Sequence, residues 1–186
     1  MMRYQRSVLL AAMAILSACQ SAYVPPPANT QTARLRVLQI GGDNTDVQKL
    51  KTACLTTEKN ARNFGDYFEK IANFSGVSSA SDLQRLGMPD PPAAPVKFTE
   101  IAIDATRPFL LGYNSMRFVS GYPQSVTYTC VMGLSFVPQP SEDYEAVISR
   151  ASDTQCRFEI QRLTVGKGTA AREKVDSARL LREACL

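Results

Sequence analysis

Histidine is absent from this chain of 186 residues, and its absence excludes the commonest forms of acid–base and nucleophilic catalysis. Because histidine is the usual general base at neutral pH, the chain cannot contain a Ser-His-Asp or Cys-His catalytic centre. The G-x-S-x-G, H-E-x-x-H and complete phosphate-loop patterns are also missing. Residues 166–169 are similar to a phosphate-loop fragment, but without the upstream glycine they favour a turn. We therefore expect a protein that is not an enzyme and uses no cofactor.

Metal sites and nucleic-acid surfaces are equally poorly supported. Zinc sites are usually built from paired cysteines and histidines, and no C-x-x-C pair occurs. Asp43 and Asp46 follow two glycines without the remaining ligands of a calcium loop, so we interpret them as a turn. Only Arg34 and Arg36 resemble a basic patch, and we expect them on the solvated face of a strand. We expect no metal and no nucleic-acid partner.

No hydrophobic run is long enough to be a good permanent membrane span, which needs about 20 apolar residues. The apolar stretch at residues 7–18 follows Arg3 and Arg6 and ends in Leu-Ser-Ala before Cys19. This order of a basic head, a short apolar stretch and small residues predicts a secretory signal peptide. An uncleaved anchor helix and a conventional signal peptide that happens to contain a cysteine are the alternatives.

The four residues that end at Cys19 resemble the lipobox of bacterial lipoproteins. The resemblance implies cleavage before Cys19 and a diacylglycerol on its thiol. Two or three acyl chains make membrane attachment lasting without a spanning helix. By resemblance to the sorting rule of enteric lipoproteins, Gln20 in place of aspartate after the cysteine favours the outer membrane. The expected location is therefore the outer membrane, with the domain in the periplasm or at the cell surface.

Loss of residues 1–18 would leave a nearly neutral chain long enough for one domain. Removing Arg3 and Arg6 reduces the 21 basic residues to 19, against 17 acidic ones. Residues 19–32 contain three consecutive prolines among polar residues, which predicts an extended, flexible tether. We expect residues 33–186 to form a single globular domain.

The pattern of apolar residues predicts a mainly β fold. Every even position from residue 126 to 136 is apolar, which is typical of a strand with one buried face. Residues 138–142 then predict a turn, residues 143–149 a returning strand and residues 156–165 a third strand. Nearer the N-terminus, residues 33–40 and 47–55 also read as strands, so we expect an antiparallel sheet or sandwich.

Helical spacing occurs in three other segments. Residues 57–74 place aromatic and aliphatic side chains at helical intervals, and residues 81–86 suggest a short helical segment. The strongest prediction is a C-terminal helix, because its apolar residues recur at intervals of three and four and fall on one helix face. They are Ala171, Val175, Ala178, Leu181 and Cys185.

The four cysteines after Cys19 predict two disulfides in an exported chain. They are Cys54, Cys130, Cys156 and Cys185. Cys130 and Cys156 lie at similar distances before and after the predicted turn at residues 138–142, so we favour their pairing. Cys54 and Cys185 would then form the second disulfide, although four cysteines allow three pairings.

Two clusters are candidates for a functional site. Carboxylates gather at Glu142, Asp143 and Glu145; a paired-carboxylate glycosidase site is the chemical interpretation, and a solvated turn is favoured. Aromatic residues gather in a segment with several turn-forming residues, which we interpret as a long hairpin loop. Exposed aromatics on loops can anchor a partner, although packing against the core is commoner. These aromatics are Tyr113, Phe118 and Tyr122.

The chain also resembles a group of small proteobacterial lipoproteins. The resemblance rests on residues 33–36 (Ala-Arg-Leu-Arg), 87–89 (Gly-Met-Pro) and 136–138 (Phe-Val-Pro), with Asp143-Tyr144 and the flanking Cys130 and Cys156. It implies the lipid anchor and the fold, and it carries no activity.

The sequence as a whole predicts a lipid-anchored cell-envelope protein with a disulfide-stabilised β domain and a C-terminal helix. Its expected role is that of an interaction module or an accessory subunit that binds another envelope protein. Inhibition of a host or rival hydrolase is the alternative within the binding class. A carboxylate-dependent envelope hydrolase that uses Glu142 and Glu145 is the alternative from another class.

Overall fold

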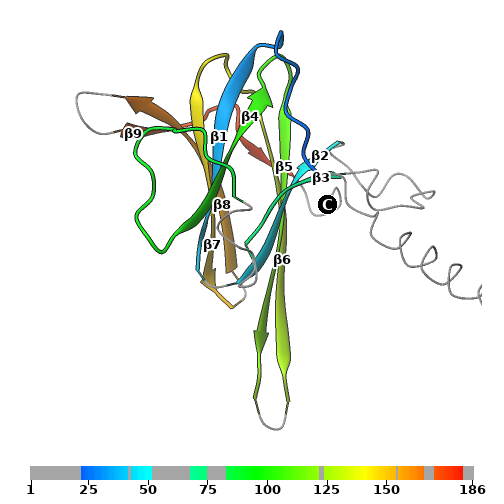
Figure 1. Cartoon of the computed structure of the whole chain (residues 1–186). Coiled ribbons are helices and arrows are strands. Elements are labelled where there is room, and N and C mark those ends of the chain that lie inside the picture. The colour runs from blue at the N-terminus through cyan, green and yellow to red at the C-terminus, as the bar shows by residue number, and fades with distance from the viewer. Residues whose placement is uncertain are drawn as a thin grey trace, which may run out of the picture.

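The chain folds into two five-stranded sheets that pack face to face (Figure 1). The computed structural model describes residues 22–41, 43–51, 68–74, 83–121, 124–153, 155–165 and 170–181. One sheet has the strand order β4-β1-β7-β8-β9 and the other the order β10-β6-β5-β2-β3. The strands are β1 (Thr32–Ile40), β2 (Asn44–Leu50), β3 (Phe68–Asn73), β4 (Lys97–Asp104), β5 (Phe109–Val119), β6 (Val126–Phe136), β7 (Asp143–Ser152), β8 (Gln155–Val165), β9 (Ala170–Lys174) and β10 (Arg179–Leu180).

The hydrophobic core lies between the two sheets. Alternate residues of each strand point to one face of a sheet, and in β1 these are Ala33, Leu35 and Val37, all buried. They pack in one cluster with Leu111 of β5 and Phe136 of β6 from the opposite sheet. The mainly β class expected from the sequence is therefore confirmed.

The strands predicted at residues 33–40, 126–136 and 156–165 are confirmed, but the predicted hairpin between residues 126 and 149 is wrong. β6 pairs with β5, whereas β7 lies in the other sheet between β1 and β8. Residues 137–142 therefore carry the chain from one sheet to the other. Alternation identifies a strand that has one buried face, but it does not identify which strand lies beside it.

The structure contradicts the predicted helices wherever it describes them. Residues 68–73 form β3, and residues 83–86 contain no helix. The predicted C-terminal helix is replaced by β9, which pairs with β8, and by β10, which pairs with β6; Cys185 lies outside the described residues. Helical spacing misled here because Val175 and Ala178, which do pack against the core, lie between β9 and β10 and not on a helix. β9 itself is mostly exposed.

One disulfide joins the two sheets. Cys130 of β6 and Cys156 of β8 are bonded, with their Cα atoms 6.2 Å apart, so the favoured pairing of these two cysteines is confirmed. After β6 the chain crosses to the other sheet, and β7 runs in the opposite direction along it. The end of β7 and the start of β8 therefore lie close to Cys130. Cys54 and Cys185 lie outside the described residues.

A buried cluster of charged side chains covers the outer face of the β4-β1-β7 part of its sheet. Arg36 of β1 is 0% exposed, and it lies opposite Glu100 of β4 and Glu145 of β7. Its guanidinium donates to Glu100 Oε1 at 2.9 Å and to Glu145 Oε2 at 3.0 Å. The expectation that Arg36 is solvated is therefore wrong, because carboxylates directly opposite on both neighbouring strands compensate its charge.

The loop of residues 83–96 closes over this cluster (Figure 1). Arg36 donates further hydrogen bonds to the carbonyl oxygens of Met88, Pro89 and Asp90, at 2.9–3.0 Å. The backbone N–H groups of Leu86 and Met88 donate to Glu100 Oε2. Burial raises the pKa of Glu100, but hydrogen bonds from Leu86, Arg36 and Met88 outweigh burial and leave the pKa below its usual value.

Replacing Arg36 with methionine should therefore destabilise the fold severely. Removing one partner of a buried ion pair leaves an uncompensated charge and typically costs about 3–5 kcal/mol. Arg34→Met is the comparison, because Arg34 pairs with Asp143 on the same strands and the two side chains are 42% and 9% exposed. Its loss should be smaller than that of Arg36→Met, because water reaches the Arg34 side of the pair. Urea unfolding measures the free energy of unfolding of the two variants. Equal losses of stability in Arg36→Met and Arg34→Met would contradict the conclusion that the buried pairs of Arg36 are the more important ones.

The Glu100 carboxylate should also make the fold sensitive to acid. Its pKa in the folded state is lowered, whereas an unperturbed glutamate has a pKa of about 4.3. Ionised Glu100 therefore stabilises the fold above that pH, and this stabilisation is lost as the pH falls through the folded-state value. The free energy of unfolding should fall more steeply below pH of about 4.5 in the wild type than in Glu100→Gln. Parallel curves for the two proteins would contradict this prediction.

Candidate binding surface

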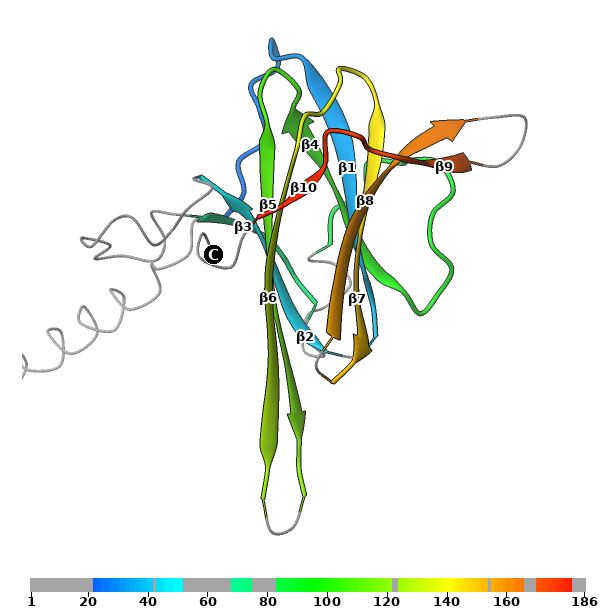
Figure 2. The same cartoon turned by 180° about the vertical axis from the view of Figure 1, so that it is seen from behind.

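The β5–β6 hairpin extends well beyond the rest of both sheets (Figures 1 and 2). Its strands pair without interruption from Phe109 opposite Phe136 to Val119 opposite Val126. Neighbouring strands cover only the inner part, since β2 pairs with β5 as far as Met116 and β10 pairs with β6 only at Leu134 and Ser135. We refer to the outer part, residues 116–129, as the β5–β6 arm. Within the described part of the chain, no strand pairs with either edge of the arm beyond Met116.

The arm exposes large apolar side chains on both of its faces. On one face lie Met116 and Phe118, which are 52% and 68% exposed and stand opposite Thr129 and Thr127. On the other face, Val119 and Val126 stand opposite each other and are also exposed. Val131, 50% exposed, continues the first face towards the body. Isolated exposed apolar residues are ordinary, but a group on one projecting element makes that element a candidate interaction surface.

Charge is almost absent from this region of the chain. Between Pro108 and Ser141 the sequence contains one charged residue, Arg117. That guanidinium is already paired, since its Nη1 lies 3.0 Å from Asp153 Oδ1 at the end of the β7–β8 connection. Burial explains the lack of charge near Phe109 and Phe136, but it does not explain the exposed arm. Depletion of charge with aromatic enrichment is the compositional signature of the core of a protein interface.

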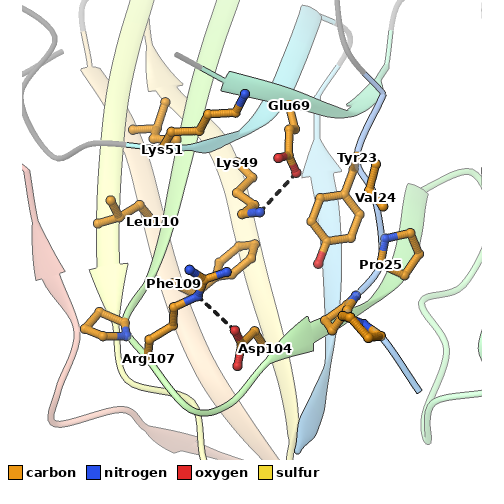
Figure 3. A pocket seen from close by; sticks show the side chains of 14 residues that line it. Tyr23, Val24, Pro25, Lys49, Lys51, Glu69, Asp104, Arg107, Phe109 and Leu110 are labelled. Carbon is orange, nitrogen blue, oxygen red and sulfur yellow. Dashed lines mark hydrogen bonds and ion pairs between the residues drawn. The ribbon is translucent and has the colours of Figure 1, made fainter. Parts of the chain in front are cut away.

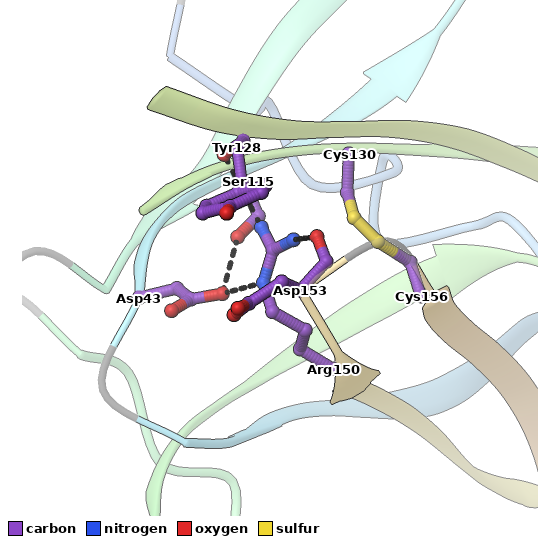
Figure 4. Close-up of a disulfide and its surroundings, with 7 residues drawn as sticks. All are labelled: Asp43, Ser115, Tyr128, Cys130, Arg150, Asp153 and Cys156. Carbon is purple, nitrogen blue, oxygen red and sulfur yellow. Dashed lines mark hydrogen bonds and ion pairs between the residues drawn. A yellow bond between two sulfur atoms is a disulfide. The ribbon is translucent and has the colours of Figure 1, made fainter. Parts of the chain in front are cut away.

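The base of the arm is fixed to the opposite sheet (Figure 4). The Cys130–Cys156 disulfide holds β6, and an ion pair between Arg150 and Asp43 lies beside it, with 2.5 Å between Arg150 Nε and Asp43 Oδ2. The same Asp43 oxygen accepts a hydrogen bond from Ser115 Oγ of β5 at 3.2 Å. Both strands of the arm are therefore held where they leave the body.

The predicted aromatic residues separate in the structure. Tyr113 is buried at 3% exposure and packs against Phe158 in the core, and this burial raises the pKa of its hydroxyl. Phe118 projects from the arm, and Tyr122 lies outside the described residues. The predicted long loop is instead the strand β5. The turn-forming residues around Tyr113 misled that prediction. The sequence did contain a signal for β5, because an eleven-residue strand at 126–136 requires a partner of similar length.

Two carboxylates of the predicted cluster, Asp143 and Glu145, belong to ion pairs. Glu142 lies half-buried at the turn before β7, where its N–H donates to the Gln139 carbonyl oxygen. Asp143 accepts two hydrogen bonds of 2.7 Å from Arg34. Glu145 is almost fully buried and accepts hydrogen bonds from Arg36 and from Arg172 Nε at 2.8 Å. The described residues contain no group of three or more side chains suited to hold a metal ion. They also contain no helix long and apolar enough to cross a membrane.

Comparison with family models and with curated proteins found no match.

Removing the disulfide should loosen the arm as well as lower stability. A disulfide that closes a loop with 26 residues of separation stabilises a fold by about 3.5 kcal/mol in the chain-entropy description. The double variant Cys130→Ala/Cys156→Ala should lose stability of that order in urea unfolding. Backbone amides near Ser115 should also exchange hydrogen faster than those of β1. Unchanged exchange near Ser115 would show that the Arg150–Asp43 ion pair holds the arm alone.

Proposed function

We propose that this protein is a lipid-anchored component of the cell envelope, attached to the outer membrane through Cys19, that acts as a non-enzymatic binding module. The β5–β6 arm is the element that contacts its partner. The observation that carries this proposal is the projection beyond both sheets of a hairpin that exposes Met116 and Phe118 and has Arg117 as its one charged residue. The likeness to small proteobacterial lipoproteins and the signal-like residues 1–18 support the anchor.

The chemistry of the arm suits a protein partner better than the interior of a lipid bilayer. Backbone N–H and C=O groups along both free edges of the arm need hydrogen-bond partners, and hydrocarbon supplies none. A protein can cover the apolar faces and also satisfy those edges, by strand addition or by side chains. The expected partner is therefore another envelope protein with an apolar, largely uncharged groove, of which this chain is an accessory subunit.

Inhibition of a hydrolase is the second candidate, and the shape of the arm supports it. A narrow hairpin with apolar residues on both faces suits a cleft that surrounds it, such as the substrate cleft of an enzyme. An inhibitor would bind a soluble hydrolase in the absence of the lipid, whereas an accessory subunit would require the anchor. A hydrolase that uses Glu142 and Glu145 has less support, because the Glu145 carboxylate is enclosed by two arginines.

Photo-crosslinking in living cells tests the arm directly. A photo-reactive phenylalanine analogue in place of Phe118, in the full-length chain, should give one specific crosslinked species. Adding Met116→Ser should reduce that species by about 10-fold or more, as expected for the loss of an interface anchor residue. Val165 is the matched control position, because it is 73% exposed but lies at the end of β8 in the other sheet.

The two binding roles give different results in the same experiment. A crosslink that is lost when Cys19→Ala removes the anchor supports the accessory subunit, and one that persists to a soluble hydrolase supports the inhibitor. Equal crosslinking from positions 118 and 165, or a species that Met116→Ser does not diminish, would refute the arm as the binding element.

A further inference from the structure

Residues 22–31, for which the composition suggested a tether, lie on the folded body. Ala22 forms a parallel bridge with Lys70 of β3, and the Tyr23 N–H donates to the Lys70 carbonyl oxygen at 2.8 Å. At the other end of the segment, the Ala105 N–H donates to the Gln31 carbonyl oxygen at 2.9 Å. We refer to residues 22–31 as the N-terminal strap. It is held at both of its ends.

Tyr23 makes the principal contacts of the strap (Figure 3). Its hydroxyl donates to the Ala102 carbonyl oxygen of β4 at 2.7 Å, and its ring packs edge-to-face on Phe109 of β5 at 6.5 Å between centroids. The Lys49 ammonium lies 5.5 Å from the ring centroid. Burial raises the pKa of the Tyr23 hydroxyl, and Glu69 and Asp104 raise it further. The hydroxyl is therefore neutral and remains a hydrogen-bond donor at physiological pH.

The strap changes how far the body can lie from an anchor at Cys19. An extended chain spans at most about 3.5 Å per residue, so the three steps from Cys19 to Ala22 reach about 10 Å. If the chain were free as far as Ala33, the same anchor would allow the body to move about 50 Å from the membrane. Docking of Tyr23 removes most of that distance.

The surface beside Tyr23 has a charge that suits phospholipid headgroups. Lys49, Lys51 and Arg107 line a hollow of about 480 Å³ next to the strap, together with Glu69 and Asp104. Lys49 pairs with Glu69 at 3.0 Å and Arg107 with Asp104 at 2.8 Å (Figure 3), so Lys51 supplies the excess positive charge of the hollow. Lys70 adds a fourth basic residue at the bridge to Ala22. Basic residues close to an anionic leaflet are attracted to it.

We propose that the strap holds the body against the bilayer, with the side that bears Tyr23, Lys51 and Arg107 facing the phospholipid headgroups. The proposal rests on the lipid anchor of the proposed function. It adds the orientation of the body and identifies the phospholipid surface as a second contact, separate from the arm. Lys51 and the Arg107 side chain, both exposed, are the groups nearest to that surface.

Lysine labelling tests which side faces the bilayer. The acylated full-length protein is compared in detergent and in vesicles of phosphatidylethanolamine and phosphatidylglycerol, using a water-soluble amine reagent and mass spectrometry. Labelling of Lys51 should fall at least 5-fold in vesicles. Lys174 is the control, since it is exposed on β9, on the opposite side of the molecule from β2 and β3 (Figures 1 and 2); its labelling should not change.

The role of Tyr23 is tested by the height of the body above a supported bilayer, measured by neutron reflectometry. Protein density should begin within about 10 Å of the headgroups in the wild type and move outward by tens of ångströms in Tyr23→Ala. Tyr23→Phe is the matched comparison, because it keeps the ring contacts and loses only the hydroxyl bond to Ala102, so its density should move outward less than that of Tyr23→Ala. An intact Cys130–Cys156 disulfide and unchanged β-type circular dichroism establish that Tyr23→Ala is folded.

Failure of the anchor and failure of this inference are distinguishable. Absence of a lipid on Cys19 by mass spectrometry would overturn both. Acylated protein in which vesicles leave Lys51 labelling unchanged, or in which Tyr23→Ala leaves the height unchanged, would overturn the orientation alone and leave the arm as the proposed binding element.

Discussion

The ion pairs of Arg36 with Glu100 and Glu145 are the interaction on which the arrangement of the molecule depends. They join three adjacent strands through side chains that lie directly opposite one another, and one of these pairings is the parallel β1–β7 contact. A slip of one residue would turn Glu145 to the other face of its strand and leave the buried guanidinium without a partner. The register of β7 in turn places Arg150 and the start of β8 beside the base of the arm. The ion pairs of Arg36 therefore stabilise one sheet and also place Arg150 and Cys156, which hold the base of the arm in the other sheet.

A projecting two-stranded hairpin is marginally stable by itself in water, so the arm depends on its base. The disulfide at Cys130 and the Asp43–Arg150 ion pair act on neighbouring strands of the arm. The strap and the arm act on the same sheet, since Lys70 pairs with Gln48 and Gln48 with Gly112. Phe118 lies six residues beyond Gly112 along β5, or about 20 Å. A body held at the bilayer by Tyr23 would therefore present the arm to a partner that is itself close to the membrane.

The sequence predicted individual strands better than their partners. Alternation at residues 126–136 reports a buried face whatever strand lies alongside, and the prediction was confirmed. The partners of Arg36 lie 64 and 109 residues away, and no local pattern identifies such contacts, so Arg36 was expected in solvent. Phe118 was a candidate from the sequence, but the projecting pair of strands that carries it was not predicted, for a different reason. The scarcity of charge between Pro108 and Ser141 is visible in the sequence, but an uncharged stretch equally describes a buried strand until exposure is known.

The strap shows why composition alone cannot distinguish a tether from a docked segment. Three consecutive prolines do not form a helix or an inner strand, and in that respect residues 25–27 conform to expectation. Proline also reduces the conformational entropy that an extended segment loses when it docks, so the same residues lower the cost of holding the strap on the body. One aromatic residue with a hydrogen-bonding group then suffices to fix its position, and Tyr23 provides both an apolar ring and a donor. A proline-rich segment that follows a lipid attachment site therefore extends the reach of a domain only if no residue within it docks on that domain.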